Sequence, residues 1–232
     1  AAERMAAPAV PVDLFRLDHK VALVTGSSRG LGAGLASALA GAGAGVALHA
    51  SEDPPSAAAL AIASATGRRT ETLTADLLDP AAAEALVSGT IERFGRIDIL
   101  VNNAGIIRRQ PAVDHTDENW DSVIEVNLSS VFRLCRAAGR HMLEQGGGKI
   151  INITSIDALH PSAVGLAHYD ASKHGVWGFT KNAALELSQY KIWVNAIAPG
   201  AVATPGVEAA QKNAPAGGVD MAKMLEGFLA KI

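Results

Sequence analysis

The sequence has few of the residues that build disulfide frameworks or metal sites. Cys135 is the only cysteine in 232 residues, which excludes an internal disulfide and a cysteine-based metal cluster. A single thiol is typical of a reducing compartment, so we expect a cytoplasmic protein without a bound metal. The histidines lack metal-ligand spacing and are expected at the surface or in a cleft; they include His49, His115, His160, His168 and His174.

The sequence also lacks a strong charge bias and long apolar runs. Twenty basic against 23 acidic residues give a formal net charge of −3, which provides no attraction to nucleic acid or to an anionic membrane. No apolar run reaches the roughly 18 residues that span a bilayer, and the Ala- and Pro-rich start lacks the apolar core of a signal peptide. We therefore expect neither a nucleic-acid nor a membrane partner.

What the sequence does contain is a strand, a glycine turn and a helix near its start. The apolar run at 21–24 predicts a buried strand, and leucines spaced by four from Leu31 predict a helix face. Gly26 permits a tight turn, Gly30 a close approach to a pyrophosphate, and Gly32 close packing of helix on strand. Such a turn aims backbone N–H groups and a helix dipole at a phosphate, although it can also simply cap a helix.

Strands and helices alternate along the rest of the chain. This order predicts an α/β fold of the Rossmann type, a doubly wound parallel sheet with helices on both faces, in a single domain at 19–232 after an arm at 1–18. Strands are expected at 21–24, 45–50, 70–75, 97–102, 149–154 and 192–198. Helices are expected from 30 to about 43, at 56–66, from 79 to 94, from 117 to about 145 with a soft break at Gly139, and at about 168–188.

Polar residues follow the predicted strands where they reach one edge of the sheet. Parallel sheets bind ligands beyond the carboxyl ends of their strands, so these residues are expected to share one crevice. They are Gly26, Asp76, Asn103, Ser155 and Pro199–Gly200, with Ala50 at the end of the second strand.

Tyr169 and Lys173 are four positions apart on a predicted helix and therefore point to the same place. A neighbouring ammonium should lower the pKa of the phenol and make Tyr169 a usable acid and base. Ser155 can hold a substrate carbonyl by a hydrogen bond. Asn127 can fix a water that relays protons to Lys173.

In this order, the motifs resemble those of the short-chain dehydrogenase/reductase family over about residues 20–204. The resemblance implies a nicotinamide cofactor and a catalytic tetrad of Asn127, Ser155, Tyr169 and Lys173. In ketone reduction Tyr169 would protonate the forming alkoxide, Lys173 would bind the nicotinamide ribose, and Ser155 would orient the oxygen. The implied cofactor-binding residues are Thr25, Gly26, Ser28, Arg29, Gly30, Leu31, Gly32, Ser51, Asp76, Leu77, Asn103, Ala104, Gly105, Tyr169, Lys173, Pro199, Gly200, Val202 and Thr204.

The end of the second strand bears on the choice between NAD(H) and NADP(H). An acid there usually binds the ribose diol of NAD, but Ala50 occupies this position, with Ser51 next and the acids Glu52 and Asp53 just beyond. Arg29 could meet a 2′-phosphate with help from Ser51. The sequence therefore leans slightly to NADP(H).

The segment 97–110 resembles the sugar-acid branch of the family, such as 2-deoxy-gluconate 3-dehydrogenase and gluconate 5-dehydrogenase. Arg108 and Arg109 could bind a substrate carboxylate, or could simply be solvated loop residues. We expect oxidoreduction of a secondary alcohol or ketone on a sugar acid.

Two departures from the family pattern keep alternatives open. Ser155 and Tyr169 are 14 positions apart where 13 is common, so the intervening loop has one more residue or the serine is shifted. The segment 201–232 lacks the usual last strand, and its final part, 221–232, predicts an amphipathic helix. The alternatives are a 3-oxoacyl-carrier-protein reductase, docking its carrier through Arg136, Arg140 and His141, and a cofactor-binding regulatory protein. A homo-oligomer, dimer or tetramer, is expected from the family resemblance, and Trp120 and Phe132 are expected in the core or in an interface.

Overall fold

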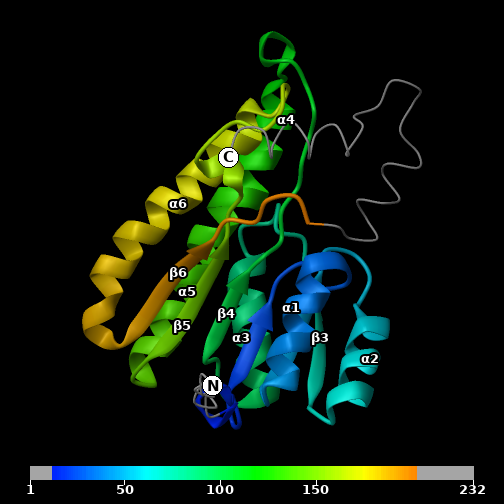
Figure 1. The fold of residues 1–232 in the computed structure, drawn as a ribbon, viewed down its shortest axis with the longest axis vertical. Helices are drawn as coiled ribbons and strands as arrows, with labels where there is room; N and C mark the ends of the chain where they lie inside the picture. The colour runs from blue at the N-terminus through cyan, green and yellow to red at the C-terminus, as the bar shows by residue number, and fades with distance from the viewer. Residues whose placement is uncertain (1–11, 203–232) are drawn as a thin grey trace, which may run out of the picture.

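Six parallel strands form one sheet in the computed structural model of the chain, which describes residues 12–202 (Figure 1). Across the sheet the strand order is β3-β2-β1-β4-β5-β6. The order along the chain reverses between β1 and β4, which is where doubly wound sheets open a binding crevice. The strands are β1 (Val21–Val24), β2 (Gly45–Ala50), β3 (Thr70–Thr74), β4 (Ile99–Asn102), β5 (Gly148–Ile153) and β6 (Ile192–Ile197).

Helices connect the strands and cover the two faces of the sheet (Figure 1). The predicted Rossmann-type fold and its order of elements are confirmed, with the ends of elements displaced by at most three residues. The helices are α1 (Gly30–Gly41), α2 (Ser56–Thr66), α3 (Ala82–Phe94), α4 (Asp117–Ile124), α5 (Ser130–Glu144) and α6 (Ala167–Leu187).

The sheet separates two hydrophobic cores because neighbouring strand residues point to opposite faces. Ala22 and Val24 pack with α1 and α2, whereas Leu23, between them, packs in the other core with α3, α5 and α6. All three side chains are fully buried. Fully buried strands of this kind explain the continuous apolar runs of the sequence.

The long helical region after β4 differs from its prediction. Gly139 is buried inside α5, and the helix continues through it without a break. The interruption is a π-helical turn at Glu125–Ser129, between α4 and α5. This turn contains Asn127, and π-turns inside α-helices are frequent at functional sites.

Other expectations concern the surface and the chain ends. Trp120 and Phe132 are 41% and 44% exposed, so neither belongs to the core. No helix within residues 12–202 is long and apolar enough to cross a membrane. In the same range no group of three or more His, Cys, Asp or Glu side chains is arranged to hold a metal ion. The predicted helix at 221–232 and most of the arm lie outside the described residues.

Candidate active site

The glycine turn between β1 and α1 has the geometry of a phosphate cradle. Gly26 and Gly30 adopt φ angles of 61° and 58°, a region that favours glycine. Helix α1 begins at Gly30, and Arg29 before it makes no side-chain capping bond. The N–H groups of the first helical turn therefore have no side-chain cap and point, with the helix dipole, into the crevice. These features fit the pyrophosphate of a dinucleotide.

Gly32 and Asn103 hold this turn against the central strands. A Cβ added to Gly32 would overlap the carbonyl oxygen of Gly26 and lie 2.5 Å from Nδ2 of Asn103. That amide donates to the carbonyl oxygens of Thr25 and Gly26 at 2.9 and 3.1 Å. The structure thus has the close packing expected at Gly32. The Asn103 amide, just after β4, holds the glycine turn in place through these two hydrogen bonds.

Two residues expected at the cofactor have side chains directed into the protein. Thr25 is buried; its hydroxyl donates to the Val101 carbonyl and accepts the N–H groups of Asn103 and Ala104. Leu77 is 4% exposed and packs in the core beneath the sheet. The side chains of both residues pack inside the protein, so only their backbone atoms can face a ligand.

The other expected cofactor residues differ in exposure. Asp76 is exposed, and its carboxylate accepts the Leu78 N–H at 3.0 Å in a local turn. The Pro199 carbonyl, after β6, accepts the Ile156 N–H at 3.0 Å and so lies beside the segment after β5. Exposed positions include Ser28, Arg29, Ser51, Gly105, Gly200 and Val202, whereas Leu31 and Ala104 are half-buried. Thr204 lies outside the described residues.

The four tetrad residues come from three elements that meet at this edge. Lys173 is 4% exposed; its Nζ donates to the Ile153 carbonyl at 2.9 Å and lies 5.6 Å from the centre of the Tyr169 ring. Asn127 is fully buried and donates to the Ile106 carbonyl and to the Ser172 hydroxyl. A Cβ added to Gly105 would lie 3.3 Å from Oδ1 of Asn127 and 3.6 Å from Nζ of Lys173, so the β4 loop closes over both.

Ser155 reaches the same site despite the 14-residue spacing. It begins the short 3₁₀-helix Ile156–Ala158 after β5, and its hydroxyl hydrogen-bonds with Tyr169. The same hydroxyl also donates to the Asp157 carboxylate at 3.0 Å and accepts the Asp157 N–H at 3.1 Å. Ser155 is therefore held next to the phenol at the start of the loop.

The expectation that Lys173 lowers the pKa of Tyr169 is wrong for this structure. Burial raises the pKa of Tyr169, the Ser155 hydrogen bond opposes this, and the carboxylates of Asp157 and Asp170 raise it further. The Lys173 ammonium instead points at the Ile153 carbonyl, and its own burial lowers the pKa of Lys173 to about 8. The phenol is thus poised as an acid rather than as a base at neutral pH.

Asp157 is a site residue that sequence reasoning missed. It is 6% exposed, bonds to Ser155, and accepts the Ser162 N–H at 2.8 Å. The only sign of this role in the sequence was that Asp157 lies two residues after Ser155. The path of the loop brings the Asp157 carboxylate near Tyr169, and that path could not be derived from the sequence. The charge of Asp157 acts directly on Tyr169.

Two histidines expected at the surface or in a cleft are buried. His49 is 2% exposed, and its ring bonds to the backbone of Gly26 and Ala75. His168 is fully buried and contacts His115 with ring centres 4.3 Å apart and ring planes tilted by 52°. Both positions face protein interior because strand β2 and helix α6 are covered at these points.

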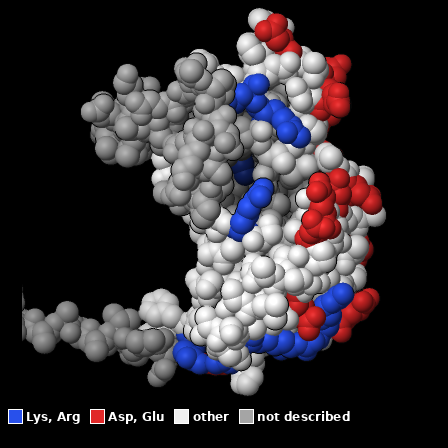
Figure 2. Space-filling model, turned by 90° about the vertical axis from the view of Figure 1, so that its right-hand side faces the viewer, with Lys and Arg blue, Asp and Glu red and all other residues white. Residues whose placement is uncertain are grey.

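Arg108 and Arg109 are exposed on the loop that follows β4. This loop leads to Gln110, whose N–H donates to the Gly165 carbonyl in the segment before α6. In the face drawn in Figure 2, basic side chains reach the hollowed middle, whereas acidic side chains lie along the margin. The carboxyl edge therefore offers positive charge near the crevice.

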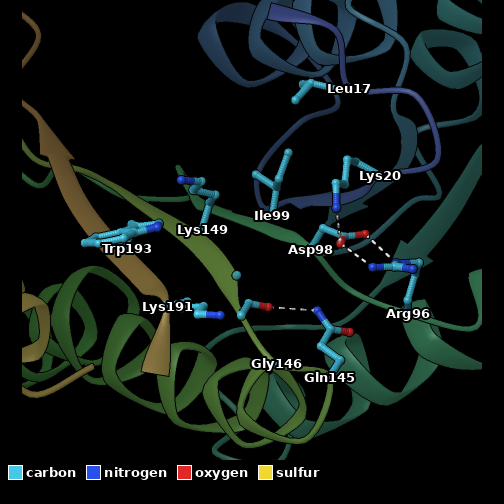
Figure 3. A pocket seen from close by; sticks show the side chains of 12 residues that line it. Leu17, Lys20, Arg96, Asp98, Ile99, Gln145, Gly146, Lys149, Lys191 and Trp193 are labelled. Atoms are coloured by element: carbon cyan, nitrogen blue, oxygen red, sulfur yellow. Dashed lines mark hydrogen bonds and ion pairs between the residues drawn. The ribbon is translucent and has the colours of Figure 1, made fainter. Parts of the chain in front are cut away.

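A second hollow lies at the opposite edge of the sheet (Figure 3). It is lined by residues at the amino ends of β1, β4, β5 and β6, among them Lys20, Asp98, Lys149 and Lys191. Arg96 and Lys20 both pair with the carboxylate of Asp98, which also accepts the Val21 N–H. These ion pairs stabilise the amino edge of the sheet, which lies opposite the tetrad.

Comparison with known proteins identifies the architecture. The family model described as short chain dehydrogenase matches residues 20–215. The chain belongs to the short-chain dehydrogenase family. Members of this family are NAD(P)-dependent oxidoreductases, so the short-chain dehydrogenase described here is an enzyme of that class.

Three relatives illustrate the range of similarity. The chain is 43% identical to the 2-dehydro-3-deoxy-D-gluconate 5-dehydrogenase of Dickeya dadantii, over 83% of this chain and 76% of the relative. It is 40% identical to the 3-oxoacyl-[acyl-carrier-protein] reductase FabG of Escherichia coli, over 88% and 82%. A structure from Agrobacterium tumefaciens with bound NADP, assigned provisionally as a 2-deoxy-d-gluconate 3-dehydrogenase, superposes with a TM-score of 0.80 at 37% identity, covering 94% and 82%.

Proposed function

We propose that this short-chain dehydrogenase interconverts a secondary hydroxyl and a keto group on a sugar acid, with NADP(H) as cofactor. The observation that carries the proposal is the convergence of Asn127, Ser155, Tyr169 and Lys173 at one edge of the sheet, beside the glycine turn. When bound, the nicotinamide supplies or accepts the hydride.

The residues of the chain supply the proton and the positioning. The Ser155 hydroxyl holds the substrate oxygen, and the Tyr169 hydroxyl gives its proton to that oxygen or takes one from it. Below a pH of about 8 the Lys173 amine is charged and can bind the ribose hydroxyls. Asn127 fixes the π-helical turn to Ile106, which keeps the β4 loop over Lys173.

The NADP(H) preference rests on the end of β2. Ala50 ends the strand without a carboxylate, and exposed Arg29 and Ser51 flank the same edge. A guanidinium suits a 2′-phosphate better than a ribose diol. We expect the KM for NADP(H) to be at least about tenfold below that for NAD(H), in line with one charged hydrogen bond. A lower KM for NAD(H) would contradict this preference.

The sugar-acid substrate rests on the two arginines of the β4 loop and on the names of relatives. The chain is 43–45% identical in sequence to three proteins named 2-dehydro-3-deoxy-D-gluconate 5-dehydrogenase. In an Arg108→Ala, Arg109→Ala variant we expect the KM for an acidic sugar substrate to rise about tenfold. The KM for an uncharged ketone should not change.

The matched control is Arg140→Ala, which removes an exposed arginine from α5. It also tests the second candidate function, since relatives named 3-oxoacyl-[acyl-carrier-protein] reductase share 40–41% identity. Arg136, Arg140 and His141 would form the carrier-docking surface, with Arg136 stacked on Phe132 at 4.9 Å. Turnover of a carrier-bound 3-oxo ester that Arg140→Ala weakens, without turnover of sugar acids, would establish this second function.

A regulatory protein that only binds cofactor has no need of Tyr169 and Lys173 at one site. Family membership and the tetrad therefore favour the enzyme. A homo-oligomer, dimer or tetramer, remains part of the proposal and is supported by the exposed Phe132 on α5. A reducing compartment, the cytoplasm, suits the buried free thiol of Cys135.

A further inference from the structure

His49 is a buried imidazole that joins the glycine turn to the strand on its other side. Its Nδ1 lies 3.1 Å from the Gly26 nitrogen, and its Nε2 lies 2.9 Å from the Ala75 carbonyl oxygen. A backbone N–H only donates and a carbonyl only accepts, so Nδ1 must be unprotonated and Nε2 must carry the hydrogen. The surroundings require one neutral tautomer.

The backbone of the same residue strengthens this connection. The His49 N–H donates to the Ser27 hydroxyl at 2.9 Å, and the Ser27 N–H donates to the His49 carbonyl at 2.9 Å. The Ser27 hydroxyl in turn donates to the Val24 carbonyl at 2.8 Å. His49 in β2 therefore holds both Gly26 and Ser27 in place.

We infer that His49 is a positioning residue for the dinucleotide. Its ring fixes the peptide of Gly26, whose φ of 61° sets the direction of the N–H groups that follow in the cradle. Through Ala75 it also connects the cradle to Asp76, one of the residues implied in cofactor binding. The inference rests on cofactor binding at the proposed site, but not on the identity of the substrate.

Protonation of His49 would remove the acceptor for Gly26. Burial lowers the pKa of His49, while the Ala75 carbonyl and the Asp76 carboxylate oppose this. The groups that face the ring are the Gly26 N–H from the turn and the Ala75 carbonyl after β3, and the charge that acts on it is the carboxylate of Asp76. The ring is therefore neutral at and above the usual value of about 6.5. Its support for the cradle is lost as the pH falls through the lowered value.

Two substitutions distinguish the loss of the His49 hydrogen-bond acceptor from the protonation of its ring. His49→Leu removes the acceptor, and we expect NADP⁺ affinity at pH 8, measured by calorimetry, to fall about tenfold, as for one buried unsatisfied N–H. His49→Asn offers an amide oxygen near the place of Nδ1 but does not titrate. It should bind NADP⁺ within about threefold of the wild type at pH 8.

The pH series from 8 to 5 gives the second readout. Protonation of the 2′-phosphate of NADP⁺ affects binding to both proteins equally, whereas only the wild type has a ring at position 49 that can be protonated. We therefore expect the wild type to lose more NADP⁺ affinity at acidic pH than His49→Asn. His19→Asn is the matched control, because His19 is exposed at the amino edge of the sheet; it should follow the wild type.

A folded His49→Leu protein with wild-type affinity would overturn the inference, as would equal acid weakening in the wild type and His49→Asn. Because only cofactor affinity is measured, failure of sugar-acid turnover would refute the proposed function and leave this result standing.

Discussion

Asp157 places a negative charge next to the phenol of Tyr169, the proposed proton donor and acceptor. Its carboxylate raises the pKa of Tyr169, in addition to the larger effect of burial. Oxidation of a hydroxyl needs the ionised phenol, so its rate should increase as the pH rises through this pKa. In Asp157→Asn we expect the midpoint of the pH–rate profile for oxidation to move to lower pH.

The control for this prediction is Asp114→Asn, at an exposed position in the 3₁₀-helix Ala112–Asp114. Its profile should match the wild type. An unchanged midpoint in Asp157→Asn, measured with saturating cofactor, would show that the carboxylate does not act on Tyr169.

Single residues were predictable from the sequence where a motif fixed their neighbours. The spacing of Tyr169 and Lys173 placed both on one turn of α6, as found. The direction of the pKa shift of Tyr169 was not predictable, because it depends on burial and on where the Lys173 ammonium points. Asp157 and His49 were missed for a similar reason, since their contacts join segments distant in sequence or depend on a loop path.

At the scale of elements, the close approach of α1 to the glycine turn requires a glycine at position 32. A Cβ at Gly32 would overlap the Gly26 carbonyl, whereas a Cβ at Gly34 would meet nothing within 4 Å. Gly32→Ala should therefore shift the turn, lower the free energy of unfolding by about 1–3 kcal/mol and weaken NADP⁺ binding at least about tenfold.

Gly34→Ala is the matched substitution in the same helix. Its position is exposed, so it should raise the free energy of unfolding by about 0.5–1 kcal/mol and leave cofactor affinity unchanged. Urea unfolding and calorimetry measure both quantities. Equal effects of the two substitutions would contradict the packing described for Gly32.

The elements themselves were largely predictable because their apolar patterns are long and regular. The central strands β1, β2 and β4 are buried along almost their whole length, and the glycine turn marks the start of α1. The π-helical turn at Glu125–Ser129 was not predictable, because it arises from the contacts of Asn127 with the β4 loop rather than from local propensity.

At the scale of the whole molecule, the sheet has two chemically different edges. The carboxyl edge gathers the cradle and the tetrad, whereas the amino edge is held by Asp98 and its cations (Figure 3). A parallel sheet requires this division, because equivalent ends of all strands meet on one side. The order of strands in the sequence was therefore enough to predict that the residues after each strand would lie along one edge of the sheet.

We propose that Tyr169 transfers the proton in a nicotinamide-dependent reaction on a sugar acid. The most direct test is the absorbance change of the nicotinamide when the protein is given NAD or NADP with a panel of sugar acids. We expect turnover that falls at least about a hundredfold in Tyr169→Phe. Tyr190→Phe, at the other tyrosine of the chain and half exposed, should retain it. Undiminished turnover in Tyr169→Phe, or cofactor binding without turnover of any sugar acid, would contradict the account.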